Sequence, residues 1–171
     1  MAEATLVTLP DSPVKDVADL AGKKVAITSP KGVSEMLLLM VLKEKGVDAA
    51  QVQRVASGGY VNGLTMLEQN AVAGAVLIEP LSIVRKDKYR TVYNAGAVLQ
   101  PMTTSVGITT RAFAKEHPEK LRAIIEGRQA GVRATYRDPA AAAKLLETSF
   151  KLTPEVAREA VDNMVKSRMW S

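Results

Sequence analysis

The sequence predicts an α/β fold, with a mostly parallel sheet flanked by helices and then a helical C-terminal segment. Short apolar runs alternate with helix-forming stretches over about the first hundred residues, a pattern typical of parallel sheets covered on both faces. Glycine and proline stand between these runs and mark their ends. From Arg111 onward the pattern is helical, so this last part of the chain is expected to contain only helices.

The composition describes a globular chain and excludes several classes of function. Of the 171 residues, 47% are hydrophobic and 24% are charged, which suits one domain or two small lobes with an apolar core. The net charge is +5, but the basic residues are scattered and not interleaved with aromatic residues, so we expect no nucleic-acid partner. The chain has no cysteine, one histidine (His117) and no motif-like pair of carboxylates. We therefore expect no metal site, no cofactor and no enzymatic activity.

The elements of the first part follow from apolar runs and their boundaries. The leucine-rich run from Val33 to Lys45 predicts a helix, with Gly46 as its stop and basic residues in its last turn. Gly22 is expected to end a short helical turn in the same way. The other expected elements are helices over residues 60–69 and 81–86 and strands over residues 4–9, 24–28, 52–57, 73–80, 89–95 and 104–110.

Proline marks the starts of the expected C-terminal helices. Pro118 is well placed to begin a long helix, and Asp138 and Thr153 each precede a proline and are expected to be N-caps. The long helix has one approximately apolar face, which consists of Leu121, Ile124, Ile125, Val132 and Tyr136.

Three segments are expected beyond the carboxyl ends of parallel strands, where α/β sheets bind ligands: Thr28–Ser34, Ser57–Asn62 and Glu79. The first leads into a helix start, whose free N–H groups and dipole favour anions. It offers the hydroxyls of Ser29 and Ser34, the charge of Lys31 and, at Gly32, room for close approach of the backbone. It lacks the spacing of a nucleotide P-loop. The alternative is a plain turn in which Ser29 or Ser34 caps the helix.

The other two segments each allow two interpretations. Gly58 and Gly59 permit either close approach of a ligand or a tight turn, and Tyr60 either stacks on a ligand or covers the core. Glu79 ends an apolar strand, so its carboxylate either belongs to a site or caps the following helix.

The order of these motifs resembles a known family over nearly the whole chain. The stretches "DVADLAGKKVAITSPKGVSEMLLLMVLKEKG", "SGGY" and "AVLIEP" follow one another, and "FAKEHPEKLRAII" and "YRDPAAAAKLL" come later. In this order they resemble the substrate-binding proteins of ABC transporters, in the branch for nitrate, sulfonate, taurine and thiamine precursors. The chain departs from the usual pattern at Asn70, where the family has glycine, and at Ala73, where it has aspartate.

The resemblance implies a type II periplasmic-binding fold that binds a small anionic or heteroaromatic ligand in a cleft between two lobes. The ligand contacts in this lobe would be Ser29, Lys31, Gly32, Val33, Ser34, Gly58, Gly59, Tyr60 and Glu79. The partner of the full-length protein would be an ABC transporter permease, and its location would be periplasmic or otherwise extracytoplasmic. The start of this chain lacks the basic residues and long apolar core of a signal peptide.

The resemblance also implies a division of the chain. Residues 1–11 would form a hinge strand, residues 12–104 the α/β lobe, and residues 105–171 a return segment belonging to an otherwise missing first lobe. We expect these C-terminal helices to expose apolar surface and to pair with a second copy as a homodimer. The alternative function is a small-molecule-sensing domain of a transcriptional regulator with the same fold, although no helix-turn-helix precedes it. Thiamine-pyrimidine synthases share the fold, but their cysteine-rich motif is absent.

Overall fold

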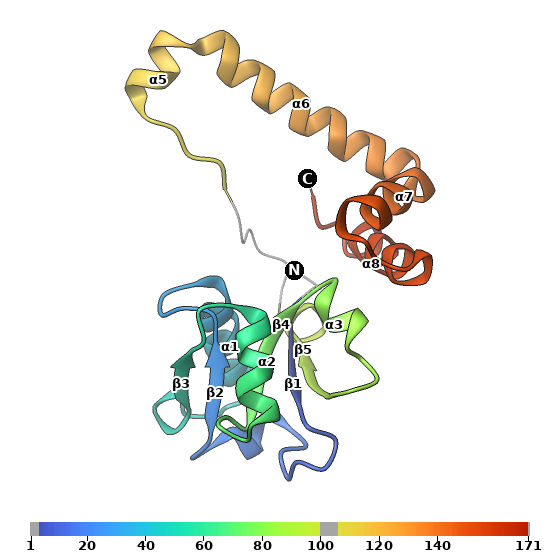
Figure 1. Ribbon diagram of the computed structural model, residues 1–171. Helices are drawn as coiled ribbons and strands as arrows, with labels where there is room; N and C mark the ends of the chain where they lie inside the picture. Colours follow the sequence, from blue (N-terminus) through green and yellow to red (C-terminus); the bar gives the residue numbers. More distant parts are fainter. Residues whose placement is uncertain (1–3, 100–105, 171) are drawn as a thin grey trace. The chain divides into compact units, whose positions relative to one another are not determined.

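A computed structural model describes residues 4–99 and 106–170 of the chain (Figure 1). The chain divides into two compact units between residues 102 and 103. Unit 1 is an α/β lobe and unit 2 is helical. The predicted fold class is thus confirmed, including the helical C-terminal segment.

Unit 1 contains five strands and six short or medium helical elements in its described residues. The strands are β1 (Ala4–Thr8), β2 (Lys24–Ile27), β3 (Gln53–Ala56), β4 (Gly74–Ile78) and β5 (Arg90–Asn94). The helices are α1 (Val33–Glu44), α2 (Tyr60–Glu68), α3 (Leu81–Val84) and α4 (Ala95–Val98), with 3-10 turns η1 (Val17–Leu20) and η2 (Ala49–Gln51).

The five strands form one mixed sheet in the order β3-β2-β4-β1-β5. β2 pairs parallel with β3 and β4, whereas β1 pairs antiparallel with β4 and β5. Four strands therefore run in one direction and β1 runs in the other. The alternation of apolar runs predicts the parallel part but not the place of β1, because an apolar run carries no information about strand direction. A hinge role for residues 1–11 stays a prediction.

Both faces of the sheet are covered, because successive side chains of a strand point to opposite sides. On β2, Val25 and Ile27 join the core beneath α1 and η1, and Ala26 joins the core beneath α2. The apolar residues of the two helices are buried against these faces; they are Leu37, Leu38, Val41 and Leu42 on α1, and Leu64 and Leu67 on α2. Unit 1 is therefore a three-layer lobe (Figure 1).

Residues with positive φ follow the two longest helices of unit 1, and Gly22, with φ 75°, follows the 3-10 turn η1 as predicted. Gly46 has φ 69° just after α1, as its sequence position predicts. Asn70 has φ 56° just after α2, where its N–H donates to the carbonyl of Leu67 at 3.0 Å. Asparagine tolerates this left-handed conformation better than most residues do. Asn70 therefore forms the turn in place of the glycine that is usual in the family.

Unit 2 consists of α5 (Arg111–Glu116), α6 (Pro118–Arg137), α7 (Pro139–Phe150) and α8 (Pro154–Lys166) in its described residues. The predicted starts are confirmed: the Asp138 side chain accepts from the N–H of Ala141, and the Thr153 hydroxyl accepts from the N–H of Val156. Each proline stands at the first helical position. The helices α7 and α8 pack through a small core that contains Ala143, Ala157, Ala160 and Val161.

The strand expected over residues 104–110 is wrong for the part that the structure describes. Residues 106–110 have no regular secondary structure, and residues 104 and 105 lie outside the described residues. No described strand pairs with residues 106–110, and Ile108 is 91% exposed. A strand needs the backbone of a neighbour, so an alternating pattern alone does not make one. Among the described residues, no helix is long and apolar enough to span a membrane.

Candidate functional site

The three predicted segments come together at the carboxyl ends of β2, β3 and β4, because these strands run in the same direction. The first two are joined by hydrogen bonds: the N–H of Ser57 donates to the carbonyl of Ile27 at 2.8 Å, and the N–H of Gly58 donates to that of Thr28 at 2.9 Å. We call residues 28–34, 57–62 and 78–79 the carboxyl-edge surface. All nine predicted ligand-binding residues fall within these three ranges, and eight of them are exposed or half-buried.

Ser34 lies beneath this surface rather than on it. Ser34 is 1% exposed. Its hydroxyl accepts a hydrogen bond from the N–H of Thr28 at 2.9 Å and lies 2.8 Å from the Thr28 hydroxyl. Ser57 plays a similar part, since its hydroxyl lies 2.9 Å from the Ile27 carbonyl. These hydroxyls hold the loops together. A contact between Ser34 and a ligand stays a proposal, and we propose it for the backbone N–H of Ser34 and not for its hydroxyl.

Two helices, one on each face of the sheet, begin at this surface without a side-chain cap. The N-cap of α1 is Gly32 and that of α2 is Gly59. Neither serine of the first loop caps α1, because the Ser34 hydroxyl is engaged with Thr28 and the exposed Ser29 hydroxyl makes no hydrogen bond to the described residues. The alternative interpretation, a turn in which Ser29 or Ser34 caps the helix, is therefore wrong. Open N–H groups at two helix starts create a positive potential.

The loop before α1 is held in an unusual backbone conformation. Lys31 has φ 60°, and its N–H donates to Glu35 Oε2 at 2.6 Å. The Lys31 side chain is exposed and makes no ion pair within residues 4–99 and 106–170. A cation is therefore available next to the α1 start.

Tyr60, the first residue of α2, is half-buried and packs against the core on the α2 face of the sheet. It thus covers the core, one of its two expected roles. Burial raises the pKa of the Tyr60 hydroxyl above its ordinary value, because the phenolate would lose solvation. The hydroxyl therefore stays a hydrogen-bond donor near neutral pH.

Three exposed apolar side chains belong to the carboxyl-edge surface. Val33 is 40% exposed, Val61 is 63% exposed and Ile78 is 36% exposed. Val33 is the first residue of α1, Val61 is the second residue of α2, and Ile78 is the last residue of β4. Neither Val61 nor Ile78 is among the predicted site residues, because Ile78 ends an apolar run that looks like core and Val61 lies in the glycine-rich segment 58–63. Glu79, half-buried, follows Ile78 at the same edge.

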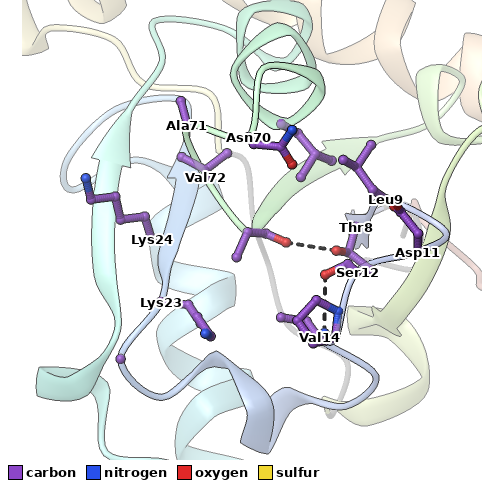
Figure 2. A pocket seen from close by; sticks show the side chains of 14 residues that line it. Thr8, Leu9, Asp11, Ser12, Val14, Lys23, Lys24, Asn70, Ala71 and Val72 are labelled. Atoms are coloured by element: carbon purple, nitrogen blue, oxygen red, sulfur yellow. Dashed lines mark hydrogen bonds between the residues drawn. The ribbon is translucent and has the colours of Figure 1, made fainter.

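A cavity of about 430 Å³ lies elsewhere in unit 1 (Figure 2). Its walls are the loop after β1, the start of β2 and the loop between α2 and β4, and Lys23, Asn70 and Ser12 are among its residues. Its buried hydroxyl, that of Thr8, already donates to the Ala73 carbonyl at 2.8 Å (Figure 2). The parallel strands begin at this edge, whereas ligands of α/β sheets bind where such strands end. None of the predicted site residues lines the cavity.

No grouping of three or more His, Cys, Asp or Glu side chains that could hold a metal ion occurs within the part of the chain that the structure describes. The carboxyl-edge surface offers backbone N–H donors at two helix starts, the ammonium group of Lys31 and the phenol of Tyr60. It also has an apolar rim, by which we mean Val33, Val61 and Ile78.

The fold is that of a type II periplasmic-binding lobe followed by helices, and the sequence matches the model of the NMT1/THI5-like family over residues 2–142. The chain belongs to this family. The predicted resemblance is confirmed. No protein with a curated description matches the sequence.

Solved structures of sulfonate-binding proteins share the fold. The periplasmic aliphatic sulphonate-binding protein SsuA of Escherichia coli aligns with 95% of this chain and 55% of its own, at 20% identity and a TM-score of 0.76. The alkanesulfonate-binding protein SsuA of Xanthomonas axonopodis pv. citri, bound to MOPS, aligns over the same shares at 18% identity and a TM-score of 0.77. The chain thus spans about half the length of these proteins. The alternative of a regulator's sensing domain finds no support here.

Proposed function

We propose that this chain forms one lobe of an ABC importer's solute-binding protein and binds a small organic anion, a sulfonate, at the carboxyl-edge surface. The observation that carries the proposal is the pair of uncapped helix starts, at α1 and α2, beside the exposed Lys31. Sulfonate oxygens would accept hydrogen bonds from the first N–H groups of both helices, and the ammonium would balance the charge.

The apolar rim supports an organic rather than an inorganic anion. Val33, Val61 and Ile78 are exposed within the carboxyl-edge surface, so the hydrocarbon part of a ligand would lie against them while its charged head faces the helix starts. Two similar structures carry sulfonate-binding descriptions, and one of them is bound to MOPS, a sulfonate. Glu79 would accept from a donor group of the ligand, such as an amine.

The rest of the mechanism is proposed from the family. A second lobe would close over the ligand, and a permease would read the closed form outside the cytoplasm. The chain would bind its ligand without turning it over and without a cofactor.

We also propose that the helices of unit 2 associate with those of a second copy. A mostly apolar groove of about 640 Å³ is lined by Ile108, Phe113, Leu121, Ile124 and Ile125, among others. None of the 20 residues of α6 is buried. Exposed apolar surface of this kind commonly marks a contact with another polypeptide.

The test of the anion site is a calorimetric titration of the chain with hexanesulfonate. We expect Lys31→Gln to weaken binding by roughly fivefold, because the variant loses one charge-assisted contact. Lys43→Gln is the matched control, since it removes the same charge from the last turn of the same helix. Equal affinity of Lys31→Gln and wild type, or an equal loss in the control, would contradict the role of Lys31.

A further inference from the structure

We infer that Arg54, on strand β3, is a positioning residue for the proposed anion site, because its guanidinium neutralises the carboxylate of Glu35, which lies beside the start of α1. The inference rests on the proposed function. Glu35 is the third residue of α1, within the first turn, where an unpaired carboxylate would occupy or repel the site of an anion. Neither residue stands out in the sequence.

The contacts of Glu35 place its carboxylate beside the loop that leads into α1. One carboxylate oxygen, Oε2, accepts from the N–H of Lys31 at 2.6 Å. The other, Oε1, accepts from Nε of Arg54 at 2.9 Å. The carboxylate is thus turned toward the preceding loop and the neighbouring strand, and its negative charge is balanced by the guanidinium.

Arg54 is itself anchored and does not simply follow Glu35. Its Nη1 donates to the carbonyl of Ala49 at 2.8 Å and to that of Val52 at 3.1 Å, in the segment that leads into β3. The planar guanidinium therefore spans from this segment to the first turn of α1. Its side chain is 32% exposed and that of Glu35 is 16% exposed, so the pair is partly shielded from water.

The Arg54 guanidinium acts on Glu35 in two ways. It neutralises an acid placed where an anion is to bind, and it fixes the carboxylate that holds the N–H of Lys31 in the ligand loop. Removing the guanidinium leaves the Glu35 carboxylate without its counter-charge beside the helix start, where it would repel a bound anion. Removing the charges of both Glu35 and Arg54 abolishes this effect of the carboxylate on a bound anion.

A double-variant titration tests the inference. Hexanesulfonate binding to the full chain is measured by calorimetry at low salt for wild type, Arg54→Gln, Arg54→Lys and the double variant Glu35→Gln/Arg54→Gln. Thermal unfolding of each variant reports whether it is folded. We expect a loss of affinity of about tenfold or more in Arg54→Gln, a smaller loss in Arg54→Lys, and recovery of most of the affinity in the double variant.

A purely structural role of Arg54 gives a different result, since the double variant would then bind no better than Arg54→Gln. That outcome, or wild-type affinity in Arg54→Gln, would overturn the inference and leave the proposed function standing. A wild-type chain that binds no sulfonate would overturn both.

Discussion

Gly32 stands at a position where a side chain would meet the loop that precedes α1. A Cβ atom there would lie 2.6 Å from the Ser29 hydroxyl and 3.1 Å from the Ser29 carbonyl oxygen. The hydroxyl can rotate away, but the carbonyl belongs to the backbone and moves only with the loop. The need for glycine here comes from close approach of the backbone rather than from a positive φ, since Gly32 has φ −85°.

We predict that Gly32→Ala weakens sulfonate binding by roughly tenfold through displacement of residues 29–31, as expected when a binding loop shifts by a fraction of an ångström. The measurement is the same calorimetric titration. Gly127→Ala is the control, because a Cβ atom at Gly127 would meet nothing within 4 Å. Unchanged affinity in Gly32→Ala would show that the loop does not contact the ligand.

Two serines that look equivalent in the sequence have different roles in the structure. Ser34 is buried and bonded to Thr28, whereas Ser29 is exposed. We predict that Ser34→Ala lowers the free energy of unfolding by about 1–3 kcal/mol, because it leaves the N–H of Thr28 without its partner. Ser29→Ala should change it by less than about 0.5 kcal/mol. Urea denaturation of both variants measures this, and equal effects would contradict it.

At the scale of elements, most of the fold was predictable because its boundaries are local. Gly46 after α1 and the Asp138 and Thr153 caps of α7 and α8 act within a few residues of their own position. The place of β1 was not predictable in this way. It lies between β4 and β5, and both of these strands are distant from β1 in sequence, so the direction of β1 is set by long-range pairing.

The same distinction applies to the candidate site. The loops of the carboxyl-edge surface follow from the rule for parallel strands, and the sequence locates them. The pairing of Glu35 with Arg54 joins residues 19 positions apart and depends on the register of β2 with β3. The burial of Ser34 likewise depends on the way α1 sits on the sheet. Such contacts need the assembled fold.

The hydrogen bond between Tyr89 and Glu68 connects the residue before β5 to the last residue of α2. Burial, followed by the bond to Glu68, raises the pKa of Tyr89 from 10.0 to about 12. The folded chain therefore keeps a proton that the unfolded chain loses at about pH 10. The resulting stabilisation is complete below that pH and is lost as the pH rises toward 12.

We predict that wild type loses more stability than Tyr89→Phe between about pH 10 and 12, because phenylalanine has no proton to lose. Urea denaturation at several values of pH gives the two curves. Parallel curves would show that this hydroxyl does not contribute to the alkaline loss of stability.

At the scale of the whole molecule, unit 2 buries few of its apolar side chains and leaves several large ones exposed. Its buried apolar residues, within the described part, are Ala143, Ala157, Ala160 and Val161, whereas Ile124, Leu145 and Phe150 are exposed. Self-association would cover part of this surface.

We predict that the chain forms a dimer whose dissociation constant rises when Ile124 is changed to Gln, because that variant places an amide in the apolar groove. Sedimentation velocity over a range of concentrations measures the equilibrium. Glu126→Gln is the control, since Glu126 is exposed on the same helix and does not line the groove. A chain that stays monomeric at high concentration would rule out this pairing.

The most direct test of the central claim is a map of backbone amide shifts by NMR as hexanesulfonate is added to the chain. The account predicts that the largest shifts fall on Val33, Ser34, Tyr60 and Val61, at the starts of α1 and α2. Shifts that cluster instead on Thr8, Ser12, Lys23 and Asn70 would place the ligand in the cavity at the opposite edge of the sheet and contradict the account.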